Sequence, residues 1–590
     1  LMTNRILIHG LIVASVVLSR PCRSFAEDDA ALSPAELASA AREVMKTYCY
    51  RCHKGEGSKG GDFDVLSSSS LLVKLKDSDD TPVVKGKSAD SLIYRRLTDK
   101  EEPMPPKNIK ERPAAAEIEI IKKWIDAGAP EPAAAARKPV TLLQTLTTIH
   151  DDLKKADKED RPYLRYFTLT HLHNLPSVAE SDLRTYRAAL SKAINSLSWK
   201  KKIVLPRAVD KEQTVFAIDM RDLDWDLGDR WTHIMAAYPY GLRFNHHQDL
   251  RQVDEDIVEL TGCDMPMVRA DWFVATATRP PLYHQLLNIP HDATTLERQL
   301  GVDIEANFRR DRLARGGVFP SGVSKQNRIL ERHEATTGAY WKSYDFLPDH
   351  DKADMKKVPL GPQFRNNPYP DQAFQHDGGE IIFNLPNGLQ AYMLVDGKDQ
   401  RIDAGPTKVV GDALQTSGTT EIVNGVSCMA CHKHGMIDFK DQVLEGTAVF
   451  GPARRKVERL YSTHDKMAAW LKDDRQRFMA ALEQAAGPFL RSESDKGRKL
   501  EDYAEPISQS AVLYTNSGVD VATVAVELGL EKAEQFLIEI GKKRLEELGL
   551  GPLARGGKID RRQWETGQGL TLFQQVAREF RYTPWKYVAN

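Results

Sequence analysis

The pentapeptide Cys49-Tyr50-Arg51-Cys52-His53 constrains this chain more than any other stretch. Two thiols three residues apart can each add to a vinyl group of one porphyrin, and the histidine that follows then reaches the iron. Cys428-Met429-Ala430-Cys431-His432 repeats the pattern. With six Cys and 16 His in 590 residues, random placement gives roughly 0.002 such matches. We therefore expect two covalently attached groups of haem c (heme c). The residues that attach and ligate them are Cys49, Cys52 and His53, and Cys428, Cys431 and His432.

Zinc is the alternative occupant of such motifs. A CxxC pair with a nearby histidine can hold zinc, and His434 offers a further ligand beside the second motif. A zinc-stabilised structural module would not explain why a histidine directly follows the second cysteine in both places. We keep it as the least favoured hypothesis.

The length of the chain predicts more than one hydrophobic core, because single cores stop growing at about 250–300 residues. We expect three units. Hydrophobic residues make up 41%, charged residues 28%, and the formal net charge is -1. This balance is typical of an ordinary soluble protein. It gives no reason to expect a nucleic-acid partner.

Residues 1–26 have the pattern of a secretory signal peptide. Arg5 precedes the largely apolar run Ile6 to Leu18, and Ser24-Phe25-Ala26 provides a small-x-small cleavage site. The run is too short to span a bilayer comfortably, although Arg20 and Arg23 leave an uncleaved anchor as an alternative. Covalent haem attachment takes place outside the cytoplasm in bacteria. We therefore expect a periplasmic or otherwise exported protein with no stable membrane span after cleavage.

Residues 27–130 are expected to form the first unit. Ser33-Pro34-Ala35-Glu36 is a capping box with proline at the first helical position, and this helix leads to Cys49. Short helices are expected over residues 88–97 and 118–127. Between them, Pro103-Met104-Pro105-Pro106 is a stiff loop that could hold one thioether sulfur against a metal.

Three stretches of this unit resemble the planctomycete-type cytochrome c domain. They are the run from Cys49 through Gly60-Gly61-Asp62-Phe63, the triplet Met104-Pro105-Pro106, and the segment from Trp124 to Ala129. The resemblance implies a small all-α fold of three to four helices, with His53 as the proximal ligand and Met104 as the distal ligand. A Met/His pair raises the reduction potential and closes the iron to outside ligands, which favours electron transfer.

Residues 131–140 are a plausible linker, and residues 141–452 are expected to form a mixed domain that contains the second haem site. A helix is expected over 183–197 and a strand over 214–219. Strands 380–385 and 389–395 flank Asn387-Gly388, a strong β-hairpin signal. The residue opposite His432 is left open. The candidates are His246, His247, His284, His333, His376, Met467 and Met479.

Residues 453–590 are expected to be a helical region, with helical patterns over 456–486 and 519–548. The fold class is thus α+β and multidomain. The favoured function is single-electron transfer to and from an unidentified redox partner protein. A haem oxidoreductase with an open second iron is the main alternative.

Overall fold

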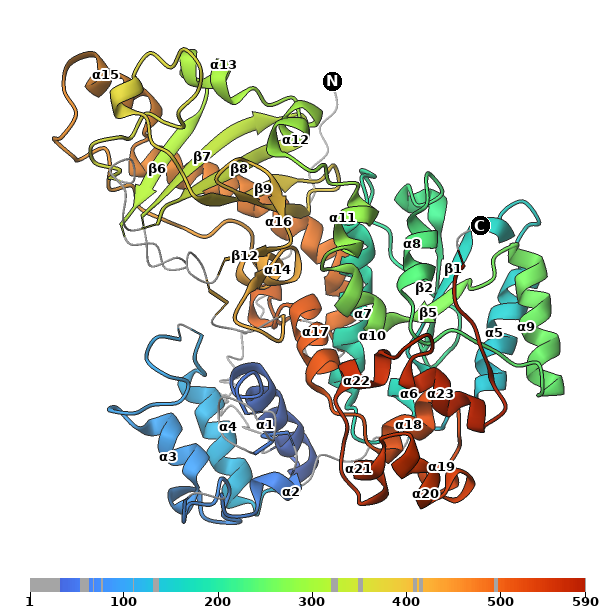
Figure 1. Cartoon of the computed structure of the whole chain (residues 1–590). Helices are drawn as coiled ribbons and strands as arrows, with labels where there is room; N and C mark the ends of the chain where they lie inside the picture. The colour runs from blue at the N-terminus through green and yellow to red at the C-terminus, as the bar shows by residue number, and fades with distance from the viewer. Residues whose placement is uncertain are drawn as a thin grey trace, which may run out of the picture.

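The computed structural model describes residues 32–53, 63–66, 68–75, 78–109, 111–130, 137–319, 327–347, 354–406, 411–412, 417–492 and 497–588. The expected signal peptide, the glycine pair at 60–61 and residues 131–136 of the expected linker lie outside these ranges. Within them, no helix combines the length and the apolar content that a membrane span requires. The α+β, multidomain fold class is confirmed (Figure 1).

In the described residues of the first unit, 32–130, the regular secondary structure is helical apart from an isolated bridge residue, Asp64. Its helices are α1 (Pro34–Tyr48), α2 (Ser68–Leu71), α3 (Leu92–Thr98) and α4 (Ala115–Asp126). The capping box is confirmed, since Ser33 Oγ accepts from Glu36 N at 3.3 Å and Glu36 Oε2 accepts from Ser33 N at 2.9 Å. The helix expected over 88–97 divides into a 3-10 turn (Ser88–Asp90) and α3, because Ser91 has extended backbone angles. Helices α1 and α4 pack together around buried apolar side chains.

The first sheet of the body, residues 137–588, has the strand order β2-β3-β1-β5. Its strands are β2 (Arg207–Ala208), β3 (Val215–Asp219), β1 (Leu164–Thr168) and β5 (Met267–Arg269), and only β1 and β5 run parallel. Helices α7 (Glu180–Ser196) and α10 (Ala270–Ala277) lie on one side, and α5 (Leu142–Lys155) and α9 (Gln248–Thr261) lie on the other (Figure 1). The expected strand over 214–219 and helix over 183–197 are confirmed. Short helices complete this region: α6 (Thr170–His173), α8 (Arg230–Ala237), α11 (Leu282–Leu287), α12 (Ala293–Gln299) and α13 (Ile304–Arg309).

The second sheet is a six-stranded antiparallel meander with the order β11-β10-β9-β8-β7-β6. Its strands are β6 (Ala314–Val318), β7 (Arg328–Ala335), β8 (Gly338–Asp345), β9 (Gly378–Asn384), β10 (Gln390–Asp396) and β11 (Arg401–Ile402). The expected hairpin is confirmed as β9 and β10, and Gly388 takes a φ of 91° in its turn. A left-handed backbone of this kind suits glycine, which has no Cβ. Beside the sheet, β12 (Ala404–Gly405) pairs with β13 (Ile422–Val423), which leads into α14 (Val426–Cys431).

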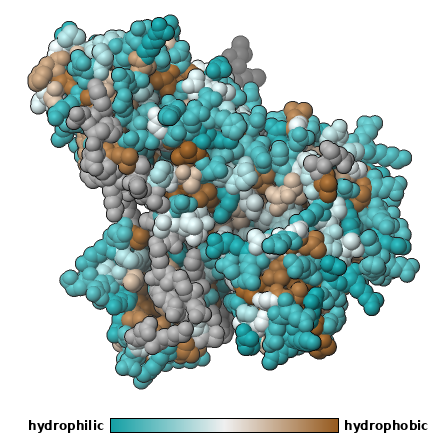
Figure 2. Space-filling view, viewed as in Figure 1, coloured by the Kyte–Doolittle hydropathy of each residue, from teal (hydrophilic) through white to brown (hydrophobic). Residues whose placement is uncertain are grey.

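Except for the first, which packs in a smaller core with β7 and β8, the C-terminal helices share one hydrophobic core with both sheets. They are α15 (Gly451–Leu460), α16 (His464–Leu490), α17 (Pro506–Asn516), α18 (Val521–Glu527), α19 (Ala533–Ile540), α20 (Lys542–Glu547), α21 (Gly551–Ala554), α22 (Arg561–Glu565) and α23 (Leu572–Glu579). The helical pattern over 519–548 is three helices, because Gly529 and Gly541 take φ values of 73° and 74°. The last strand, β14 (Thr583–Pro584), pairs with β4 (Leu242–Arg243). The visible surface is mainly hydrophilic (Figure 2).

The first unit docks on the body through a buried ion pair. Lys46 of α1 lies 2.5 Å from Asp182 of α7, and both side chains are at most 5% exposed. Arg42 also reaches Asp182, at 3.3 Å, and Ser181 donates to Glu43 at 2.8 Å. Helix α17 adds an apolar contact with the core of the first unit. Because α17 also packs against α14, it lies between the two cysteine-containing motifs.

Candidate haem sites

The two CxxCH motifs adopt the same helical turn. In the first motif, His53 N donates to Cys49 O at 3.0 Å, and in the second, His432 N donates to Cys428 O at 2.8 Å. The cysteines of each pair are three residues apart on a helical turn, so their side chains lie on the same side of it. All four cysteines are free thiols. Each motif therefore places two free thiols and the histidine that follows them on one helical turn.

The first motif follows α1 directly and is partly open to solvent. Cys49, Cys52 and His53 all have intermediate exposure. The ring of Phe63 lies 4.5 Å from the ring of His53, centroid to centroid, at an interplanar angle of 34°. The backbone carbonyl of His53 accepts from Val65 N at 2.9 Å. Phe63 and Val65 are therefore anchored to the histidine.

Met104 lies on a loop of the same unit that hydrogen bonds hold in place. Its backbone N–H donates to Arg96 O at 2.8 Å, and the guanidinium of Arg112 donates to the carbonyls of Pro105 and Pro106. The side chain of Met104 is among the exposed apolar side chains, at 40% exposure. A thioether presented outward from a fixed loop is compatible with iron ligation. Ligation by Met104 stays a prediction.

The second motif is buried against the six-stranded sheet. Cys428 is 2% exposed and His432 is 8% exposed. The Nδ1 atom of His432 lies 3.2 Å from Gly435 O. With the proton placed on Nδ1, this contact leaves Nε2 as the atom for a metal. The ring of Tyr392 lies 6.1 Å from that of His432, centroid to centroid. The chemistry of this donor set fits haem c.

Glu380 of β9 supplies the carboxylate that contacts the imidazole of His432. Its Oε2 lies 3.5 Å from His432 Nε2, and its side chain is 15% exposed. Burial acts to raise the pKa of Glu380, but the attraction of His432 and Arg328 outweighs burial and lowers it to about 2. Glu380 therefore places a carboxylate with a lowered pKa beside the imidazole of the second CxxCH motif. The sequence offers no signal for this contact, because Glu380 and His432 are far apart along the chain.

Burial disfavours the thiolate form of three motif cysteines, Cys49, Cys428 and Cys431. Burial raises the pKa of Cys49 and of Cys431 to about 12 and raises the pKa of Cys428 well above its ordinary value. Zinc is bound by thiolates. Among the described residues, no group of three or more His, Cys, Asp or Glu side chains converges as a metal site would require. The zinc hypothesis gains no support from this part of the chain.

Four of the histidines considered for the position opposite His432 make other contacts. His333 uses both ring nitrogens, with Glu331 at 2.6 Å and Asn307 at 3.0 Å. The remaining contacts are His284 with Asn424 (2.6 Å), His376 with Asp399 (3.3 Å) and His247 with Phe580 O (2.9 Å). His246 is exposed, Met467 is buried in the main core, and Met479 is partly buried against that core. None of these side chains is among the contacts of His432. The imidazole of His432 contacts the carboxylate of Glu380 instead.

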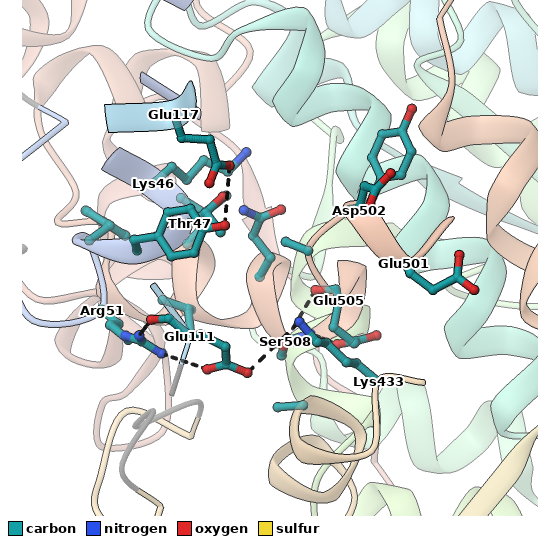
Figure 3. Close-up of a pocket in the computed structure, with 18 of the residues that line it drawn as sticks. Lys46, Thr47, Arg51, Glu111, Glu117, Lys433, Glu501, Asp502, Glu505 and Ser508 are labelled. Carbon is teal, nitrogen blue, oxygen red and sulfur yellow. Dashed lines mark hydrogen bonds and ion pairs between the residues drawn. The ribbon is translucent and has the colours of Figure 1, made fainter. Parts of the chain in front are cut away.

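The two motifs, 379 residues apart in sequence, approach each other across the interface between the units. Arg51 of the first motif lies 3.4 Å from Glu111, and Lys433, which follows the second motif, lies 4.0 Å from the same carboxylate. Beside these residues is a cavity of about 610 Å³ between the first unit and the body (Figure 3). Sequence reasoning missed Glu111, because nothing in its neighbourhood marks it as a bridge.

Residues 49–108 match the family model of the planctomycete cytochrome C. The chain therefore carries a planctomycete-type cytochrome c domain. Such a domain implies covalently bound haem c and haem-based electron transfer. Comparison with curated proteins and with solved structures found no match. The family match includes the first CxxCH motif and Met104 and ends before the second motif.

Proposed function

We propose that this chain is an exported c-type cytochrome with two covalently attached haems, which passes single electrons between them and a redox partner protein. The haems, when bound, supply the one-electron iron couple. The observation that carries the proposal is the matching turn of the two motifs, in which each histidine N–H bonds to the carbonyl of the first cysteine. Export is supported by the signal pattern of residues 1–26.

The first site is suited to exchange with an outside partner. Its three motif residues are partly exposed, and Met104 is presented at the surface of the same unit. His53 and Met104 are the proposed axial ligands, a pair that favours electron transfer over chemistry at the iron. Cys49 and Cys52 would hold the porphyrin against the end of α1.

The second site is suited to an internal role. Cys428 and His432 are buried, and the imidazole is oriented by the carbonyl of Gly435. Fixing one ring nitrogen of a metal-binding histidine sets its tautomer and orientation. Because Cys428 and His432 are buried, a partner protein would not reach the second site directly. Electrons would therefore reach the body through the first unit.

A count of attached haems tests the proposal. The full chain should be produced in a host with a c-type haem attachment system and analysed by intact-mass spectrometry and by a haem assay. We expect two haems per chain. Replacing Cys428 and Cys431 by Ser should leave one haem, and replacing Cys49 and Cys52 by Ser should leave the other. One haem in the unaltered chain would contradict the proposal.

A haem oxidoreductase is the second candidate function. It is favoured by one observation, namely that the contacts of His432 Nε2 include a carboxylate, Glu380, rather than a methionine or a second histidine. A weak or absent sixth ligand would leave the second iron open to small molecules. Carbon monoxide added to the reduced protein would distinguish the two functions. A spectral change at one haem favours the oxidoreductase, and no change at either haem favours pure electron transfer.

A further inference from the structure

Glu111 lies between the two CxxCH motifs. It contacts Arg51 of the first motif and Lys433, the residue that directly follows the second. We infer that Glu111 is the positioning residue that sets the spacing between the two haem sites and thereby the rate at which an electron crosses from one to the other. This inference rests on the proposed function, since it needs both haems to be attached. It concerns a residue that is neither a cysteine nor an iron ligand.

Arg51 fixes Glu111 relative to the first motif. Its Nη1 lies 3.4 Å from Glu111 Oε2, and its Nη2 donates to the backbone carbonyl of Glu111 at 3.4 Å. The side chain of Arg51 is only 12% exposed. Because Arg51 stands between Cys49 and Cys52, the position of the Glu111 carboxylate follows the position of the first haem site.

The second oxygen of Glu111 faces the body. Oε1 lies 4.0 Å from Nζ of Lys433, whose side chain is 31% exposed. Lys433 directly follows His432, so its backbone moves with the second motif. Figure 3 shows Arg51, Glu111 and Lys433 in sequence along one line of contacts. The contacts of Glu111 therefore connect Arg51, which lies between Cys49 and Cys52, with Lys433, which follows His432.

The interface around the bridge leaves room for the two sites to shift. The cavity of about 610 Å³ is lined by both units, including Tyr48 and Glu117 from the first unit and Tyr503 from the body. The buried Lys46–Asp182 pair fixes the docking of α1 on α7, but it includes neither motif. An exposed ion pair contributes little to stability. Glu111, at 41% exposure, should therefore influence spacing far more than folding.

The test measures intramolecular electron transfer in the full two-haem protein after rapid reduction of one haem. The variants are Glu111→Gln, Lys433→Met and both together. We expect each single change to slow the transfer several-fold, and the double variant to be no slower than the slower single variant. High salt should slow the unaltered protein toward the rate of the variants, because salt screens exposed pairs. Thermal stability and the absorption spectra of both haems should not change.

Glu117→Gln is the matched control. Glu117 lines the same cavity, but its carboxylate contacts Tyr48 of its own unit, at 3.3 Å. Its replacement should leave the transfer rate unchanged. A two-haem protein in which Glu111→Gln transfers electrons at the unaltered rate would overturn the inference alone. A chain with one haem would overturn the proposed function and the inference together, and mass spectrometry identifies that case.

Discussion

The two CxxCH sites share a local turn but differ in what surrounds them. The first follows the end of a helix in a small unit and is partly exposed, whereas the second lies within and just after α14, with Cys428 and His432 buried and Cys431 partly exposed. The near environment differs as well. A neutral thioether, Met104, is presented on a loop of the first unit, and a charged carboxylate, Glu380, lies beside the second imidazole. The same sequence motif thus lies in two different chemical surroundings.

This difference predicts a direction for electron transfer between the two sites. A neutral methionine ligand raises the potential of a haem. A buried carboxylate stabilises the more positive, oxidised iron and so lowers the potential. We expect the second haem to have the lower potential and to give electrons to the first.

The largest effect is expected from Met104→Ala. Axial ligands set haem potentials over a range of roughly 0.8 V, so loss of the thioether should lower the first potential by a sizeable part of that range. The first haem should also become high-spin, as seen by absorption and electron paramagnetic resonance spectroscopy. The second haem serves as the internal control and should not change. An unchanged spectrum would mean that another residue ligates the first iron.

Asp182→Asn separates the two sites physically. The change leaves Lys46 buried with only a partly exposed Glu43 nearby, at 3.3 Å. Breaking a buried ion pair from one side costs about 3–5 kcal/mol. We expect the first unit to detach from the body, with faster hydrogen exchange in α1 and slower electron transfer between the haems.

The exposed pair Lys122–Asp126 provides the control for this prediction. It lies on α4 of the same unit, with an N–O distance of 2.8 Å and 37% exposure of both side chains. Replacing Asp126 by Asn should leave docking and exchange in α1 unchanged. Equal effects of Asp182→Asn and Asp126→Asn would argue against a docking role for the buried pair.

The elements that could be predicted from the sequence are those specified by neighbouring residues. The capping box at Ser33 and the hairpin at Asn387-Gly388 depend on contacts within a few residues, and both are confirmed. Over 519–548 the sequence predicts helical structure and marks Gly529 and Gly541 as places where one long helix would break, because glycine readily takes a left-handed backbone. Gly529 and Gly541 do so and divide the segment into three helices.

The motif residues of the sites could be predicted, but their surroundings could not. Thiol and histidine spacing is a local signal, and it marks both turns. Glu380 and Glu111 reach their partners only through the packing of the hairpin on α14 and of the first unit on the body. Such contacts join residues that are far apart in sequence, and no periodic pattern in the sequence indicates them. The sequence predicted histidines as candidates for the second iron, and the fold pairs four of them with other groups.

Glu380→Gln tests the electrostatic half of the contrast. Glu380→Gln removes a buried negative charge a few ångströms from Nε2 of His432. Reduction of the second haem should then become more favourable by about 1–3 kcal/mol, which raises its potential. The first potential should stay the same. Spectroelectrochemical titration of both haems gives the two values. If neither potential moved, the carboxylate would not influence the second iron.

The smallest effect is an acid sensitivity confined to the body. Burial, with smaller contributions from Arg401 and His291, lowers the pKa of His284 from 6.5 to about 3. His284 lies 2.6 Å from Asn424, just before the second motif, and 3.5 Å from the largely exposed Asp403. The unfolded chain binds a proton near pH 6.5 and the folded chain does not. Stability is therefore full above pH 6.5 and falls as the pH drops toward 3.

By pH 5.5 the loss should be about 1.4 kcal/mol, one pH unit below the unfolded pKa. Urea unfolding of the body, followed between pH 7.5 and 5.5, measures it. His284→Gln keeps an acceptor for Asn424 and removes the titrating ring, so its pH dependence should be flatter by this amount. The first unit has no histidine other than the proposed ligand His53, so its unfolding should lack this component. An identical slope in His284→Gln and in the unaltered chain would place the acid sensitivity elsewhere in the body.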